Sequence, residues 1–392
     1  MNWHQQLAAD LQSAEQNHLR RYRNILAGPQ GPEISVQGQK LINFCSNDYL
    51  GFANHAKLVD SVVKAANKWG VGSGASHLVC GHQEITEQFE QDFADFVGAE
   101  AALLFSTGYM ANFAVLNSFF DREGLILQDK LNHASLIDAG RLSRAPMRRY
   151  AHADISDLER QLTSRTNRNQ PTFIATDAVF SMDGDIAPLL EISDLAQSHD
   201  ALAYFDDAHG FGVLGEQGRG SLSRLGLAPT ENRIMLATMG KAMGSFGAVV
   251  AADKVFIDTL IQKARPYIYT SALPPTVVAA NAAAIALMVE EDWRFDHLQR
   301  LICQFRTEAK SRDLQLMESA TAIQPVVIGD NQKAMECSAR LKELGFLVTA
   351  IRPPTVPVGS ARLRITLSAA HSEDQISQLF GALSVLKNEG LL

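Results

Sequence analysis

Short apolar runs rich in strand-forming residues alternate with helical patterns from about residue 41 to residue 280. Continuous apolar strands separated by helices are typical of sheets that are buried on both faces. The pattern therefore predicts an α/β fold in which helices cover both faces of a large, mainly parallel sheet. The expected strands are 102–105, 125–127, 172–176, 202–205, 234–237 and 248–251.

A second, smaller unit is expected toward the C-terminus. The 392 residues suffice for two or three folding units at the usual ~100–200 residues each. After a long helical pattern over 276–289, short strand and helix patterns alternate again, which predicts a small α/β lobe. The first ~25 residues predict a helix that Gly28-Pro29 ends. We therefore expect an N-terminal helical arm (1–45), a large domain (46–285) and a small C-terminal domain (286–392).

Composition and charge exclude several classes of protein. A net charge of −8 gives no basic surface for nucleic acid, and no apolar run approaches the ~20 residues that cross a bilayer. The N-terminal segment has no apolar core of a secretion signal, so a cytoplasmic location is expected. The four cysteines lie far apart without a C-x-x-C pair, which predicts neither a zinc site nor a disulfide framework.

Two carboxylates and a histidine directly follow the expected strand 202–205, as Asp206, Asp207 and His209. Ligands of open α/β sheets bind outside the carboxyl ends of the strands. A metal site is one interpretation, but neighbouring carboxylates point in different directions and no further ligand group is apparent. A pyridine cofactor fits better, because Asp206 can pair with a protonated ring nitrogen while His209 reaches another polar group of the ring. A solvated turn is the remaining alternative.

Lys241 lies between Gly240 and Gly244, just after the expected strand 234–237. A lysine that holds a cofactor as a Schiff base needs backbone room, burial that lowers its pKa, and a short reach to a fixed ring. A surface turn is the alternative for this segment taken alone. Together with Asp206 and His209, the segment favours the cofactor site.

Two further features fit the same site. Gly108 and Tyr109 open a helical pattern after the expected strand 102–105, and amides at a helix N-terminus can bind phosphate. Such joints are also common without a ligand. His133 can stack on an aromatic cofactor or transfer protons, although a lone histidine is more often structural.

Motifs spread over nearly the whole chain resemble those of the α-oxoamine synthases, a branch of the fold-type I pyridoxal-phosphate (PLP) transferases. They occur in the order found in that family. The matching segments are 43–51, 72–74, 179–185, 206–210, 215–220, 268–271, 352–357 and 361–364.

The resemblance implies a role for each matching residue. Lys241 holds the cofactor and acts as the catalytic base, Asp206 pairs with the pyridinium, His209 contacts the phenolic oxygen, and His133 stacks on the ring and faces the substrate. The remaining cofactor contacts are Gly108, Tyr109, Ser181 and Thr238, with Thr270 and Ser271 reaching the phosphate of a neighbouring subunit in a homodimer. The implied substrate contacts are Arg21, Asn47, Thr355 and Arg362.

Arg21 is one of three arginines, with Arg20 and Arg23, so a solvated basic face is the alternative there. The implied reaction, a step of biotin biosynthesis, is a decarboxylative condensation of L-alanine with pimeloyl-CoA or a pimeloyl carrier protein. Condensation of glycine with acetyl-CoA is the alternative within the family. A non-catalytic relative is the alternative from another class, but the joint presence of Lys241, Asp206, His209 and His133 opposes it.

Overall fold

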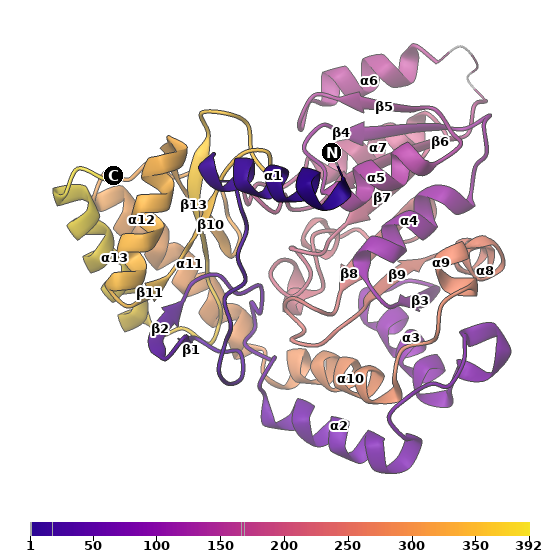
Figure 1. Ribbon diagram of the computed structural model, residues 1–392. Coiled ribbons are helices and arrows are strands. Elements are labelled where there is room, and N and C mark those ends of the chain that lie inside the picture. The colour runs from indigo at the N-terminus through magenta and orange to yellow at the C-terminus, as the bar shows by residue number, and fades with distance from the viewer. Residues whose placement is uncertain (1, 18, 166, 168) are drawn as a thin grey trace.

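The computed structural model describes residues 2–17, 19–165, 167 and 169–392, and the chain forms two lobes (Figure 1). The larger lobe is built on a seven-stranded sheet with the strand order β3-β9-β8-β7-β6-β4-β5. Only β9 runs antiparallel to its neighbours, so the expected mainly parallel sheet is confirmed. The strands are β3 (Ala101–Phe105), β4 (Leu125–Asp129), β5 (Met147–Tyr150), β6 (Thr172–Asp177), β7 (Leu202–Asp206), β8 (Arg233–Thr238) and β9 (Ala248–Ala252).

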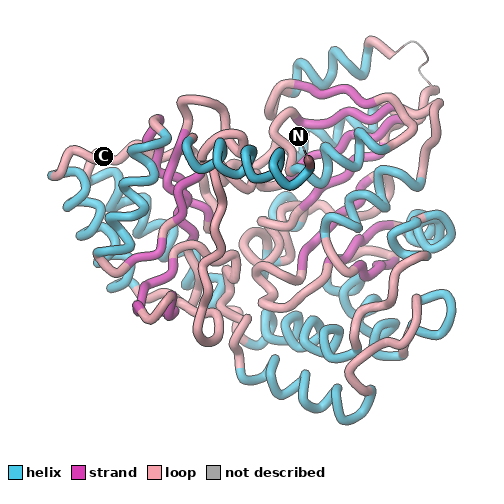
Figure 2. Tube along the Cα trace, in the orientation of Figure 1, coloured by secondary structure: helices cyan, strands magenta, loops and turns pink. Residues whose placement is uncertain are grey.

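Helices cover both faces of this sheet (Figure 2). Successive strand residues such as Leu103 and Leu104 belong to two separate hydrophobic clusters, because side chains alternate between the faces of a strand. This explains why the strands, except the edge strand β5 with its two exposed arginines, are largely continuous apolar runs. One face packs on α2 (Ala56–Trp69), α3 (Glu84–Val97), α6 (Ile155–Thr163), α7 (Leu189–Ser198) and α10 (Pro275–Glu290), and the other on α4 (Gly108–Ser118), α5 (Ala134–Leu142), α8 (Lys254–Lys263) and α9 (Arg265–Ile268).

The smaller lobe contains the expected α/β elements of the C-terminal region. Its main sheet is antiparallel with the order β10-β13-β12, and its core is continuous with one face of the large lobe. The elements are α11 (Trp293–Ser311), β10 (Ile323–Gly329), α12 (Asn331–Glu343), β11 (Phe346–Leu347), β12 (Thr349–Ile351), β13 (Ala361–Thr366) and α13 (Glu373–Asn388).

The segment 1–45 is helical only in part, which corrects the expectation of a helical arm. Helix α1 spans Trp3–Gln16, and residues 1 and 18 of the expected helix lie outside the described residues. Strands β1 (Glu33–Val36) and β2 (Gln39–Asn43) form a hairpin whose two turn residues both have positive φ, as two-residue hairpin loops require. Since β2 also pairs with β11, this hairpin belongs to the small lobe. The domain boundaries at 45 and 285 stay a prediction.

The carboxyl ends of β4, β6, β7 and β8 lie side by side in the large sheet. Each of these strands ends in a polar residue, so polar side chains gather along one edge of the sheet. Among the described residues, no helix is both long enough and apolar enough to pass through a membrane.

Candidate active site

A cavity of about 220 Å³ lies at this edge of the large sheet. It brings together eight residues that the sequence assigned to one cofactor site, with four others that it did not. The lining residues are Gly108, Tyr109, Asn112, His133, Ser135, Asp177, Ser181, Asp206, Ala208, His209, Thr238 and Lys241.

Lys241 reaches this cavity from a tight turn that follows β8. Gly244 has a φ of 62°, and a Cβ there would lie 2.3 Å from the backbone nitrogen of Ala53, so only glycine closes the turn without strain. Burial lowers the pKa of Lys241 from 10.5 to about 8, although the charges of Asp206 and Asp177 act in the opposite direction. The fraction of neutral, nucleophilic amine at neutral pH therefore rises by roughly two orders of magnitude.

Asp206 ends β7 as a buried carboxylate held at both oxygens. Its Oδ2 accepts a hydrogen bond of 2.7 Å from the side chain of Asn112, and its Oδ1 accepts one of 3.1 Å from the backbone of Ala208. Asn112 is itself fixed, because its Oδ1 accepts from the Tyr204 hydroxyl at 2.6 Å and its Nδ2 also donates to Ser135. These donors keep a negative charge at a fixed place beside the cavity.

His133 is the N-cap residue of α5 and lies in the short loop that follows β4. Its backbone N–H donates to Asp177 at 2.7 Å, and its Nδ1 lies 2.7 Å from the Ser135 hydroxyl. Burial lowers the pKa of His133, which favours the neutral ring. Burial also raises the pKa of Asp177 well above its usual range, and the nearby charge of Asp206 adds to this effect.

His209 is connected to a polar chain that reaches the small lobe. Its Nδ1 lies 2.7 Å from the Tyr49 hydroxyl, which is 3.2 Å from Oδ1 of Asn47, and Arg364 donates to the same oxygen at 3.2 Å. Burial, together with the charges of Lys241 and Arg364, lowers the pKa of His209 well below its usual range. The ring is therefore neutral and can donate only one hydrogen bond.

Arg362, the arginine that the sequence assigned to a substrate carboxylate, does not line this cavity. Its guanidinium pairs with Asp183 and donates to the backbone of Ser360. Arg364, two residues further along β13, donates to the backbone oxygen of Ser181 at 2.7 Å and to Asn47. Since Ser181 lines the cavity, Arg364 is the arginine next to the site.

The other expected substrate and phosphate contacts lie outside this cavity. Arg21 and Thr355 line a separate cavity of about 450 Å³ between the N-terminal segment and the small lobe. Thr270 and Ser271 follow α9, next to Ala272, which bonds to the loop at Ala75. Neither pair touches the 220 Å³ cavity within one chain.

Sequence reasoning missed Asn112, Asp177, Tyr49 and Arg364. Asn112 lies within an otherwise apolar stretch of α4, so a buried polar residue there was the available signal. Asp177 ends β6 next to Asp206 in register, and the strand-end rule that identified Asp206 applies to it equally.

The residues present fit PLP. Lys241 supplies the amine for a covalent bond and Asp206 a carboxylate for the pyridinium. The first amides of α4, at Gly108 and Tyr109, have no acceptor within the helix and form an anion site. A Cβ on Gly108 would lie 3.0 Å from Thr238, so the glycine allows a close approach to the backbone.

Comparisons with known proteins identify the family of this chain. The family model for aminotransferase class I and II matches residues 39–383. The 8-amino-7-oxononanoate synthase of Nitrosococcus oceani is 49% identical over 95% of this chain and 99% of its own length, and that of Cellvibrio japonicus is 47% identical over 98% and 96%.

Solved structures show the same fold. The serine palmitoyltransferase of S. paucimobilis, with bound PLP and myriocin, superposes with a TM-score of 0.92 at 27% identity and covers 98% of both chains. The 8-amino-7-oxononanoate synthase of Francisella tularensis has a TM-score of 0.78 at 31% identity and covers 90% of this chain and 99% of its own. The chain therefore belongs to the aminotransferase class I and II family and, within it, to the 8-amino-7-oxononanoate synthases, which are PLP-dependent acyl-transferring enzymes.

Proposed function

We propose that this chain condenses L-alanine with a pimeloyl thioester, releasing the thiol and carbon dioxide and forming 8-amino-7-oxononanoate for biotin biosynthesis. The observation that carries the proposal is the pairing of a lysine of lowered pKa with a fixed carboxylate in one cavity, in a chain 49% identical to a synthase of that name. CoA and a carrier protein are both compatible with this chemistry.

Bound PLP supplies an electron sink that makes the α-proton of an amino acid acidic. Lys241 is the base that removes this proton, because its lowered pKa leaves a usable fraction of neutral amine near neutral pH. Asp206 keeps the sink effective, since a fixed negative charge favours a protonated pyridine nitrogen.

Neutral histidines complete the site. His209, fixed by Tyr49, is assigned to the phenolic oxygen, and His133, fixed by Ser135, to the ring face and the substrate side. Ser181 and Thr238 line the cavity beside them. Because burial keeps both imidazoles neutral, neither competes with Lys241 for the negative charge of Asp206.

Arg364 is assigned to the alanine carboxylate, in place of Arg362. An arginine can bind a carboxylate with two parallel hydrogen bonds, and Asn47 offers a further polar group beside it. Arg362 is already paired with Asp183, so taking a substrate carboxylate would break a nearly buried ion pair.

Arg21 and Thr355 are assigned to the acyl substrate, because the cavity that they share is open to a second molecule and carries positive charge.

A homodimer is part of the proposal. The apolar residues Leu7 and Leu11 of α1 are exposed in the single chain, and a partner surface would cover them. In such a dimer, Thr270 and Ser271 can reach the phosphate in the partner's site. The expected cytoplasmic location remains a prediction.

A thiol-release assay tests the proposal. L-alanine, glycine and L-serine are each offered with acetyl, pimeloyl and palmitoyl thioesters, and Lys241→Ala serves as the inactive control. Preference for L-alanine with the pimeloyl thioester is expected. A clear preference for glycine with acetyl-CoA would contradict the substrate assignment, and thiol release by Lys241→Ala at the unchanged rate would contradict the mechanism.

A further inference from the structure

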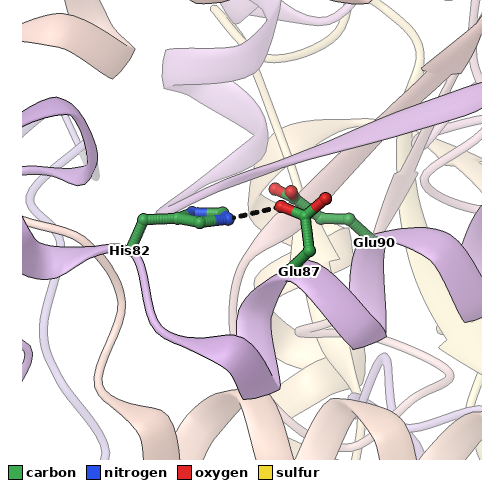
Figure 3. Close-up of side chains that lie close together, drawn as sticks. All are labelled: His82, Glu87 and Glu90. Atoms are coloured by element: carbon green, nitrogen blue, oxygen red, sulfur yellow. Dashed lines mark hydrogen bonds and ion pairs between the residues drawn. The ribbon is translucent and has the colours of Figure 1, made fainter.

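His82, Glu87 and Glu90 form a group of potential metal ligands outside the active-site cavity. His82 follows a π-helical turn, His77–Gly81, and the two glutamates lie one turn apart on α3. Figure 3 shows the histidine ring pointing toward the two carboxylates, which lie on the same side of the helix. One nitrogen or oxygen atom from each residue lies within 4.8 Å of the others.

His82 is held in a fixed orientation toward this group. Its Nε2 lies 2.8 Å from Oε2 of Glu87, while its Nδ1 lies 2.9 Å from Nδ1 of His77. The ring of His77 stacks on Tyr267 with the ring centroids 4.5 Å apart. Histidines that bind a metal through one nitrogen usually have the other nitrogen hydrogen-bonded, as here.

Glu90 carries a buried carboxyl group. It is 8% exposed, and its Oε1 accepts a hydrogen bond of 2.7 Å from the backbone of Leu104. In the part of the chain that the structure describes, no lysine, arginine or histidine forms an ion pair with it. A charge buried in this way is costly unless a cation or a hydrogen-bond donor lies against it.

We propose that His82, Glu87 and Glu90 bind one divalent transition-metal ion, with Zn²⁺ as the best match. One imidazole nitrogen and two carboxylate oxygens, with water in the fourth position, are a donor set that suits Zn²⁺. At metal–ligand distances of about 2.0–2.2 Å, tetrahedral ligand atoms lie roughly 3.3–3.6 Å apart. The present separations, from 2.8 Å to at most 4.8 Å, bracket this value, so small side-chain rotations suffice.

The bound ion would connect three parts of the chain. His82 belongs to the loop after the π-helical turn, Glu87 and Glu90 belong to α3, and Glu90 also holds β3 through Leu104. The inferred role is structural, because none of the three ligands lines the cavity that contains Lys241. The proposal therefore stands or fails independently of the proposed reaction.

Zn²⁺ titration of the full-length holoenzyme by calorimetry tests the site, after chelator treatment and removal of the chelator. One saturable Zn²⁺ per chain is expected. Binding should be lost in His82→Ala and Glu87→Gln but kept in Glu84→Gln, a matched control on the exposed first turn of the same helix. Cys80→Ser should also keep Zn²⁺ binding, which would show that the exposed neighbouring thiol is not a ligand of the ion.

The melting temperature gives a second readout. Zn²⁺ should raise the melting temperature of the wild type and of Glu84→Gln but not that of Glu87→Gln. Because the Glu87 side chain is 77% exposed, its replacement leaves the fold intact. Absence of saturable binding by the wild type would overturn the proposal. So would unchanged Zn²⁺ binding by both His82→Ala and Glu87→Gln.

Discussion

Replacing Asp206 by asparagine removes one negative charge while it keeps the shape of the side chain. In the structure this carboxylate is fixed by Asn112 and by the backbone of Ala208, so its charge has a defined position beside the cavity. We expect Asp206→Asn to slow exchange of the α-proton of alanine and to change alanine binding much less. The reason is that the negative charge of Asp206 favours a protonated pyridine nitrogen, which is needed to accept the electrons left when the proton leaves and is not needed to bind the amino acid.

The size of the effect follows from the interaction that is lost. A hydrogen bond to a charged group contributes about 1.5–3 kcal/mol, and each 1.36 kcal/mol in a barrier is about tenfold in rate. Exchange should therefore slow by roughly ten- to a hundredfold. The same substitution should lower the pKa of Lys241 below about 8, because Asp206 is the strongest of the charges that raise it.

Proton nuclear magnetic resonance in D₂O measures the exchange, and a spectral titration of the holoenzyme measures alanine binding. Asp207→Asn is the matched control. Asp207 is the next residue and equally buried, but its carboxyl accepts hydrogen bonds from Ser221 instead of lining the cavity. An equal loss of exchange and of binding in Asp206→Asn would refute the reasoning, as would equal slowing of exchange in Asp207→Asn.

Three further predictions concern neighbouring groups. Arg364→Lys should raise the KM for alanine about tenfold or more while Arg362→Lys changes it little, and steady-state kinetics showing the reverse order would contradict the assignment. The rate of PLP uptake by the apoenzyme should rise with pH and level off near the pKa of about 8 that burial gives Lys241, and a midpoint near 10.5 in stopped-flow measurements would be evidence against it. His152 lies between two aspartates, including Asp185 at 2.9 Å, and these hydrogen bonds raise its pKa to about 10. The charged histidine therefore stabilises the folded protein fully below pH ~6.5, the pKa of an unfolded histidine, and this stabilisation is lost as the pH rises through about 10. His152→Ala should therefore lower the free energy of unfolding by about 1–3 kcal/mol at pH 6 and by less at pH 10. Urea unfolding that gives the same difference between the variant and the wild type at both pH values would contradict this prediction.

Six of the seven strands of the large sheet could be predicted because they are apolar on both sides, whereas the edge strand β5 contains two exposed arginines and was not predicted. The alternation of Leu103 and Leu104 between two clusters needs hydrophobic residues at every position, which is a strong signal in the sequence. Lys241, Asp206 and His133 lie at or just after the carboxyl ends of β8, β7 and β4, which belong to one run of parallel strands, so the rule that ligands bind at strand ends predicted that they share a site.

Other features depend on contacts that the sequence does not display. Strand β2 pairs with β11 across about three hundred residues, and no local pattern reports such a pairing. Arg362 and Arg364 are two residues apart on β13 and therefore project from the same face, so strand periodicity cannot separate them. Only the positions of Asp183 and Asn47 decide which arginine lies next to the cavity.

The central claim is that Lys241 forms the covalent bond to the cofactor. Borohydride reduction of the holoenzyme, followed by peptide mass spectrometry, tests it most directly, with Lys241→Ala treated in parallel. We expect the reduced cofactor on the peptide that contains Lys241, and no labelled peptide from the variant. Cofactor attached to a different lysine, or equal labelling of Lys241→Ala, would contradict the assignment.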